Sequence, residues 1–196
     1  MTNDRIAQQL DFLIEADRLK SVLRGTTLHD GTRRENSAEH SWHIMLYALT
    51  MAEHANRPVN IDRVLRMLLL HDIVEIDAGD APIHGNHDTA EMAAKEQAAA
   101  DRLFGLLPSD QQQAYRALWE EFEAAETDDA IFAKSIDRVQ PVISNLESGG
   151  ASWIDYNVTR EQLETRVAGK VKRGAPALWE ALRLRIEAWF TARPDI

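Results

Sequence analysis

A histidine and an aspartate, His71 and Asp72, follow directly after a strongly apolar run in the first half of the chain. The run, residues 64–70, has the length and composition of a helix that is buried on most sides. Helical spacing places Glu75 near the same edge as the other two residues. Burying an imidazole and two carboxylates without partners would cost on the order of several kcal/mol each. A divalent cation neutralises carboxylates and accepts an imidazole lone pair, so this stretch predicts a metal site.

Two residues elsewhere in the chain are candidates to complete this site. His40 lies near the start of an expected helix and shares a face with Ile44 and Tyr47. Asp137 lies in the middle of an apolar helix, where a carboxylate is out of place without a partner. Two histidines and two carboxylates suit Mn, Fe, Co, Ni or Zn better than Ca. Such a set leaves positions open for water and substrate.

Each candidate also has a simpler explanation. A single histidine such as His40 is more often a core or capping residue than a ligand. Asp137 could pair with Lys134 or Arg138 on its own helix, and an adjacent histidine and aspartate can occur by chance. All four candidates occur on buried helices in the order His, His-Asp, Asp, and this combination favours the metal site.

The sequence predicts helices for the segments that position these residues. Asn60 is the expected N-cap of the helix with the apolar run, which Gly79 ends. Ser37 is the expected N-cap of the helix that carries His40, and this helix should be central because it is apolar nearly all round. Helices are expected over residues 4–23, 37–56, 60–78, 88–104, 108–125, 128–148, 159–169 and from 176 onward. Residues 25–36 read as a loop, and no segment alternates with period two. The expected fold is therefore all-α.

Length and composition limit the alternatives. The chain has 196 residues, of which 44% are hydrophobic, and we expect a single domain over residues 1–196. The net charge of −10 argues against binding a nucleic acid polymer or an anionic membrane. The absence of cysteine excludes disulfides and cysteine-based zinc sites. No apolar run reaches membrane-spanning length and no signal-peptide core is present, so we expect a cytoplasmic protein.

Four stretches of the sequence together carry a family resemblance: residues 33–42 (RRENSAEHSW), 71–75 (HDIVE), 79–82 (GDAP) and 136–138 (IDR). With them the chain resembles the HD-domain metal-dependent phosphohydrolases, and within these the branch that includes the 5′-deoxynucleotidases. The superfamily signature is specific because its four ligands must fall in order on helices. The resemblance implies an HD-domain helical bundle.

The resemblance implies roles for individual residues. The metal ligands would be His40, His71, Asp72 and Asp137. The cation could be Mn, Co, Fe, Ni, Zn or Mg.

Glu75 and Asp80 match positions on the substrate side. They would bind a second cation or orient the attacking water, and the sequence does not separate the two roles. The branch carries a substrate-binding arginine followed by tryptophan; here Arg24 is the nearest match, and Gly25 follows it. Arg33 and Arg34 are further candidates for phosphate contacts.

The predicted activity is release of phosphate from a small phosphate ester, most simply a nucleoside or deoxynucleoside 5′-monophosphate, by a metal-activated water. Other HD chemistries stay open: a nucleotide phosphodiesterase, a pyrophosphohydrolase, or a metal oxygenase that used His43, His84 or His87 as further ligands. A metal- or nucleotide-binding sensor without turnover is the alternative from another class. A homodimer is also expected, although helical periodicity does not identify its interface.

Overall fold

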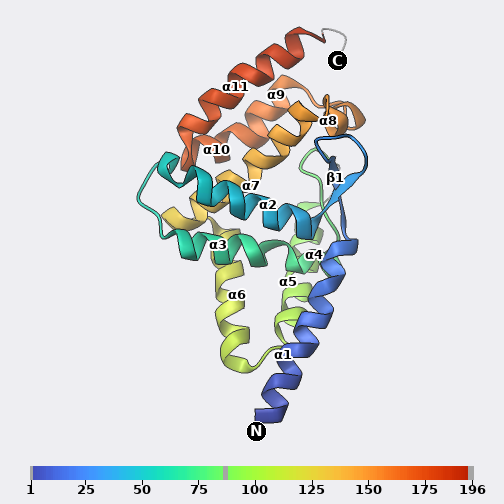
Figure 1. Ribbon diagram of the computed structural model, residues 1–196, viewed down its shortest axis with the longest axis vertical. Coiled ribbons are helices and arrows are strands. Elements are labelled where there is room, and N and C mark those ends of the chain that lie inside the picture. The colour runs from blue at the N-terminus through green and yellow to red at the C-terminus, as the bar shows by residue number, and fades with distance from the viewer. Residues whose placement is uncertain (1, 86–87, 194–196) are drawn as a thin grey trace.

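The structure is a computed structural model that describes residues 2–85 and 88–193, and it is built almost entirely from helices (Figure 1). Its first half contains α1 (Thr2–Ala16), a 3₁₀ turn η1 (Asp17–Ser21), β1 (Leu23–Thr27), β2 (Arg34–Asn36), α2 (Ser37–Met51), η2 (Ala52–His54), α3 (Ile61–Leu70), η3 (His71–Val74) and α4 (Glu75–Ala78). Its second half contains α5 (Thr89–Phe104), α6 (Ser109–Ala124), α7 (Asp128–Glu147), α8 (Ala151–Asp155), α9 (Arg160–Leu163), the π-helical η4 (Glu164–Ala168), α10 (Gly169–Gly174) and α11 (Pro176–Thr191). The all-α prediction is confirmed.

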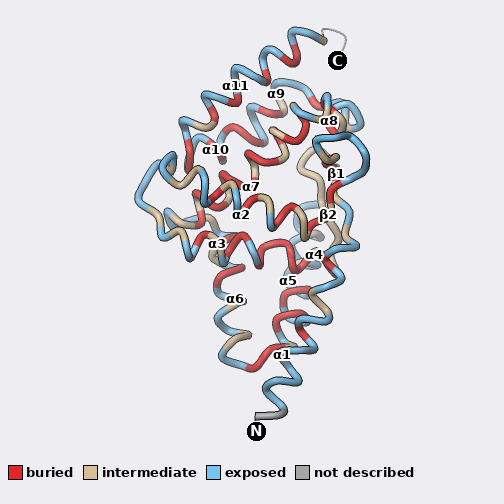
Figure 2. The backbone as a smooth tube through the Cα atoms, viewed as in Figure 1, coloured by how far each residue is buried: buried red, intermediate tan, exposed pale blue. Residues whose placement is uncertain are grey.

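Helix α7 lies at the centre of the bundle, where it contacts α2, α3, α6, α10 and α11 (Figure 1). Most of its residues are buried (Figure 2). The helix continues through Pro141, whose carbonyl accepts a hydrogen bond of 2.9 Å from the Asn145 side chain. A polar residue on α7 is therefore held deep in the protein, and this is the position of Asp137.

The helix caps agree with the sequence at most ends. The side chain of Asn60 caps α3, and Thr159 forms a reciprocal capping box with Gln162. The expected cap at Ser37 is wrong by one residue. Asn36 is the N-cap of α2, since its side chain accepts a hydrogen bond from the backbone of Glu39 and its own backbone donates to the Glu39 side chain.

The expected loop over residues 25–36 is a small antiparallel hairpin made of β1 and β2. Its inward-facing residues are polar, which is why no apolar alternation marks it in the sequence. Thr26 and Glu35 are both buried, and the Thr26 hydroxyl donates to a Glu35 carboxylate oxygen at 3.1 Å. Gly31, with φ of +72°, lies between the strands.

The expected helix over residues 60–78 is divided rather than continuous. Helix α3 ends at Leu70, the chain tightens into the 3₁₀ turn η3, and α4 adds one further turn. Gly79 then ends the segment with φ of +79°, a conformation that glycine adopts without steric cost. His71 and Asp72 begin the tight turn, and both are buried.

Two helices leave apolar side chains at the surface. Helix α1 lies at the edge of the bundle beside α5, and most of its length is exposed (Figure 2). Helix α2 is apolar nearly all round but buried on one side only, because Trp42 is 62% exposed while His40 and Ile44 on the opposite side are fully buried. No described helix has both the length and the hydropathy that crossing a membrane requires.

Candidate metal centre

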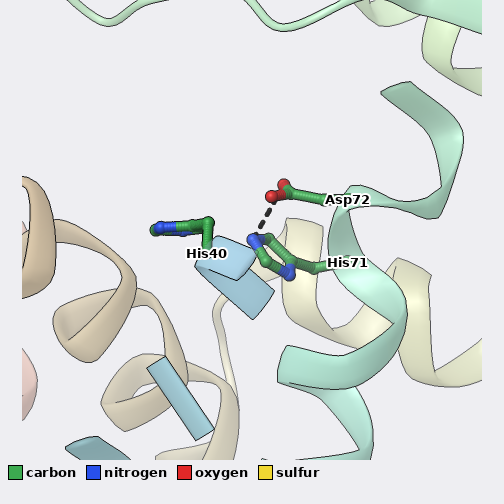
Figure 3. A group of neighbouring side chains, drawn as sticks. All are labelled: His40, His71 and Asp72. Carbon is green, nitrogen blue, oxygen red and sulfur yellow. Dashed lines mark ion pairs between the residues drawn. The ribbon is translucent and has the colours of Figure 1, made fainter. Parts of the chain in front are cut away.

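His40, His71 and Asp72 converge in the interior of the bundle (Figure 3). One ligand atom from each lies within 4.8 Å of the others. His40 comes from the first turns of α2, and the other two come from η3. The imidazole Nε2 of His71 lies 2.8 Å from a carboxylate oxygen of Asp72, the pair marked by the dashed line in Figure 3.

Asp137 joins this cluster from the middle of α7. Its Oδ1 lies 3.1 Å from His40 Nε2 and 3.8 Å from His71 Nε2. All four predicted side chains are buried. The structure therefore brings the four candidates together from three separate segments of the chain.

The other ring nitrogen of each histidine has its own hydrogen-bond partner. His71 Nδ1 lies 2.8 Å from the Leu68 carbonyl oxygen, and His40 Nδ1 lies 3.0 Å from Gln140 Oε1. A carbonyl oxygen can only accept, so Nδ1 carries a hydrogen in both rings, and Nε2 is the atom that would present a lone pair to a cation. His71 Nε2 is buried and has no hydrogen-bond partner among the described residues. Two imidazoles and two carboxylates with this orientation fit a divalent transition-metal cation.

The charges of the cluster depend strongly on one another. Burial and the Arg24 charge act to lower the pKa of His40, but hydrogen bonds to Asp137 and Glu35 outweigh them and raise it to about 9. Burial opposes ionisation of Asp72, yet the charges of His71 and Arg24 lower its pKa. The pKa of Asp137 is also lowered, since Arg138 and the histidines outweigh burial. Both carboxylates are therefore ionised at neutral pH, as metal ligands must be.

Arg24 reaches into the same cavity from β1. Its Nη1 lies 2.9 Å from Asp72, 3.7 Å from Glu75 and 3.6 Å from Asp80, and its side chain is only 11% exposed. Its Nε also lies 3.9 Å from Glu35. A single guanidinium thus lies within ion-pair distance of four carboxylates, which leaves an excess of negative charge beside the histidines.

Glu75 and Asp80 lie on the Arg24 side of the cluster, and their role on the substrate side stays a prediction. The Ser37 hydroxyl donates to Glu75 at 2.5 Å, and the Gly25 amide donates to Asp80 at 3.2 Å. Burial, followed by the charge of Asp72, raises the pKa of Glu75 well above its ordinary value. Burial also raises the pKa of Asp80, although Arg24 opposes that effect. Either carboxyl group can therefore hold a proton under conditions in which Asp72 is ionised.

Arg33 and Arg34 lie at the surface rather than in the cavity over the metal cluster. Arg33 pairs with Glu39 at 2.6 Å, and Arg34 lies 3.3 Å from Asp155. Neither arginine lines this cavity. Their role in phosphate binding stays a prediction that no contact among the described residues supports.

Two of the three further histidines considered as ligands, His43 and His84, lie outside the cluster. His84 lines a neighbouring pocket, where burial and then Arg166 lower its pKa to about 4. His43 is half-buried and packs against Trp42. His87 lies outside the described residues.

Gln140 and Glu35 are parts of the site that the sequence reasoning did not assign. Gln140 is fully buried; its amide oxygen accepts from His40, and its amide nitrogen donates to Glu35 at 2.9 Å. A glutamine three residues after Asp137, on the same buried face of an apolar helix, was the available signal for Gln140. Glu35 had no local signal, because its partners come from β1, α2 and α7.

The metal cluster lies in one of three neighbouring cavities. The metal cavity is lined by His71, Asp72, Asp137, Arg24, Glu75, Asp80, Arg138, Lys134, Glu96, Glu123, Phe122, Val74 and Ala81. A mainly apolar pocket shares Arg24, Asp80 and Arg138 with it and adds Trp153, Tyr156 and Val142 among its walls. A third, basic pocket shares Glu123, Lys134 and Arg138 with the metal cavity. Arg138 is common to all three.

Comparisons with known proteins agree with this geometry. A family model described as HD domain matches residues 16–179. The crystal structure of a predicted metal-dependent phosphohydrolase from Magnetospirillum magnetotacticum MS-1 superposes with a TM-score of 0.90 at 46% sequence identity, covering 96% of each chain. 5′-deoxynucleotidase HDDC2 of Bos taurus is 32% identical over 140 residues, which are 70% of this chain and 66% of the relative. 5′-deoxynucleotidase yfbR of Photorhabdus temperata is 27% identical over 81% of this chain and 84% of its own length.

The chain belongs to the HD domain family. These comparisons confirm the resemblance to the HD-domain metal-dependent phosphohydrolases that the sequence motifs indicated. They also confirm the resemblance to the 5′-deoxynucleotidase branch. A divalent metal belongs to that class, and His40, His71 and Asp72 are placed to bind one.

Proposed function

We propose that the protein hydrolyses the 5′-phosphate of small nucleotides, with deoxynucleoside 5′-monophosphates as the first class to test. His40, His71, Asp72 and Asp137 would hold a divalent cation. The observation that carries this proposal is the orientation of the two imidazoles. The Nε2 atoms of both face Asp137, that of His71 also faces Asp72, and each Nδ1 is occupied elsewhere. The names of the relatives supply the substrate class to test.

A bound divalent cation would lower the pKa of a coordinated water and polarise a phosphoryl oxygen. Arg24 and Arg138 line the same cavity and can neutralise charge on the transferred phosphoryl group. Glu75 or Asp80 accepts the proton of the attacking water at a carboxylate oxygen, because both lie beside Asp72 and both have a raised pKa. Hydrolysis then needs no covalent intermediate on the protein.

The apolar pocket is the place for the nucleoside. Trp153 and Tyr156 supply aromatic surface, and Gly25 stands where the branch carries tryptophan. A side chain at position 25 would meet Pro82 and Tyr156 at 3.4 Å, so these two residues occupy the space beside the backbone here. The base and sugar preference of this protein therefore depends on Pro82 and Tyr156.

The test is phosphate release from a panel of deoxy- and ribonucleoside monophosphates, each assayed with Mn, Co, Fe, Ni, Zn and Mg. Asp72→Asn removes a charge from the cluster and should abolish both turnover and metal content. Asp155→Asn is the matched control, because that carboxylate is exposed at 55% and pairs only with Arg34 among the described residues. Full activity in the Asp72 variant would refute the proposal, as would a metal-loaded protein that hydrolyses none of the panel.

We also propose that a second cation can bind at Glu75 and Asp80, beside the principal one. Both carboxylates have raised pKa values because of burial and the nearby charge of Asp72, and a second cation would remove that penalty. Metal analysis should then give two equivalents per chain in the wild type. The Glu75→Gln variant should bind one, and two equivalents in that variant would contradict this assignment.

We further propose a homodimer that acts in the cytoplasm, where its nucleotide substrates are found. The support for the dimer is the exposed apolar face of α1, on which Ile6, Leu10, Leu13 and Ile14 are all more than half exposed. Burying this face between two copies would remove it from water. Light scattering should give twice the chain mass for the wild type and a monomer for Leu10→Glu combined with Leu13→Glu. A monomeric wild type would refute the dimer.

A further inference from the structure

A cluster of basic side chains lies beside the metal cavity, in a protein whose net charge is −10. Lys134 and Arg138 come from α7, and Lys170 and Arg173 come from α10. These four cations and a single carboxylate, Glu123, supply all the ionisable groups of the pocket wall. We call this the basic pocket. Arg138 also lines the metal cavity, but the hydrolysis described above gives no role to Lys134, Lys170 or Arg173.

The fold holds the basic pocket in a fixed shape. Helix α10 packs closely on α7, since a Cβ atom at Gly174 would lie 2.1 Å from the Ser135 hydroxyl and 2.6 Å from the Ile131 carbonyl oxygen. The Ser135 hydroxyl in turn lies 3.0 Å from the Lys170 carbonyl oxygen. These backbone contacts place the basic residues of α10 next to those of α7, and they depend on glycine at this position.

The positive charge is only partly compensated. Lys134 pairs with Glu123 at 2.9 Å, and Arg138 Nη1 lies 3.7 Å from Asp137. Arg138 Nε is buried and has no hydrogen-bond partner in the described part of the chain. Among residues 4–85 and 88–193, no carboxylate lies within the 4.0 Å ion-pair distance of Lys170 or Arg173.

The cations of the basic pocket repel one another. The charge of Arg138, together with burial and the charge of Lys134, lowers the pKa of Lys170. Asp137 and Glu123 oppose this effect but do not cancel it. An anion in the pocket would relieve the repulsion, and phosphate oxygens are suited to guanidinium and ammonium donors.

The basic pocket and the metal cavity are contiguous, because Glu123, Lys134 and Arg138 line both. A molecule whose reacting phosphate lies in the metal cavity can therefore extend another group into the basic pocket. We propose that the preferred substrate is a phosphate monoester that carries a second phosphate group, and that the basic pocket binds this second group. The inference rests on the proposed phosphohydrolase function and specifies its substrate class.

The reaction balances with water as the only co-reactant. The water oxygen forms a bond to the phosphorus of the first phosphate, and the bond between that phosphorus and the ester oxygen breaks. The electron pair stays on the ester oxygen, which takes up a proton and leaves as an alcohol. The products are inorganic phosphate and an alcohol that still carries the second phosphate.

The experiment compares a nucleoside 3′,5′-bisphosphate with the matching 5′-monophosphate, using the full chain loaded with metal. Lys170→Ala combined with Arg173→Ala removes two cations of the basic pocket. Lys172→Ala is the matched control on the same helix, since Lys172 pairs with Glu164, lies over the Trp179 ring and does not line the pocket. The readouts are kcat/KM for release of the 5′-phosphate and calorimetric binding of inorganic phosphate to the same proteins.

We expect the wild type and the control to favour the bisphosphate by about tenfold or more, and the double variant to lose this preference. Phosphate should bind at two sites in the first two proteins and at one in the double variant. Equal kcat/KM for both substrates in the wild type would overturn the inference, even if two phosphates bind. Absence of turnover on every substrate would instead refute the phosphohydrolase function itself, and the substrate assignment with it.

Discussion

The hydrogen bond between His40 Nδ1 and Gln140 makes a sharp prediction about metal affinity. Gln140 has no exposed surface, and its amide oxygen lies 3.0 Å from the ring nitrogen. Replacing Gln140 by Leu fills the same space in the core with an apolar side chain of similar size, but it removes the hydrogen-bond acceptor. The His40 ring then loses the hydrogen bond that fixes its orientation and keeps the hydrogen on Nδ1.

The size of the effect follows mainly from the hydrogen bonds of Gln140 to His40 and to Glu35, which the leucine side chain cannot make. Partners that orient a metal-binding histidine typically contribute about 10- to 100-fold to metal affinity, which corresponds to about 1.4–2.7 kcal/mol. The substitution also leaves Glu35 without the 2.9 Å hydrogen bond from the Gln140 amide. A buried group without its partner costs about 1–3 kcal/mol of folding stability. The variant should therefore be less stable and bind metal 10- to 100-fold more weakly.

The assay is competition for Zn²⁺ or Co²⁺ against a chromophoric chelator, at a temperature where circular dichroism shows the variant to be folded. Ser144→Ala is the control. Ser144 is buried on the same helix and accepts a hydrogen bond of 3.0 Å from the Gln140 amide. It has no hydrogen bond to His40, so its replacement should change metal affinity less than about threefold. A Gln140→Leu variant that binds metal as tightly as the wild type would refute the reasoning.

Three further predictions concern charge, packing and substrate binding. In protein stripped of metal, the pKa of His40 is raised to about 9 from an ordinary value of 6.5. The resulting stability is fully present below pH 6.5 and is lost as the pH rises to about 9. The free energy of unfolding from denaturant titrations at pH 6 and pH 9 should therefore differ by about 3 kcal/mol, and equal values would contradict this. Gly174→Ala should cost about 1–3 kcal/mol in thermal or denaturant unfolding because of the clash with Ser135, whereas Gly169→Ala on the same helix has open space and should not destabilise the protein. Arg33→Ala should leave KM and kcat unchanged, because that side chain is paired at the surface; a severalfold rise in KM would show that it reaches the substrate.

The metal cluster could be predicted from the sequence because each ligand contradicts its surroundings. His71 and Asp72 follow an apolar run, and Asp137 interrupts an apolar helix. A polar group that contradicts a buried pattern must have a partner, and few partners satisfy two imidazoles and two carboxylates together. The structure places these residues in one cluster, and their role as ligands is the proposal that follows from it.

The hairpin and the supporting hydrogen bonds could not be predicted in the same way. Thr26 and Glu35 satisfy each other across the hairpin, so neither produces the apolar alternation that marks a strand. Gln140 and His40 are 100 residues apart in the chain, and their hydrogen bond exists only once α2 packs against α7. The break of α3 into a 3₁₀ turn at His71 likewise has no proline or glycine to signal it. The single domain over residues 1–196 stays a prediction.

The exposed faces show a further limit of pattern reading. An apolar stripe on a helix predicts burial, but it does not say against what. On α1 the residue that packs inward is Phe12, which contacts Phe104 and Tyr115, while Leu13 beside it is 62% exposed. An apolar stripe on a helix therefore predicts a contact, but it does not distinguish a contact inside the protein from one between molecules.

The most direct measurement is a crystal structure of the protein grown with Mn²⁺ and recorded at a wavelength where manganese scatters anomalously. The account predicts an anomalous peak at about 2.0–2.4 Å from Nε2 of both His40 and His71 and from carboxylate oxygens of Asp72 and Asp137. A manganese ion held only by the carboxylates on the Arg24 side, with the two histidines unligated, would contradict it.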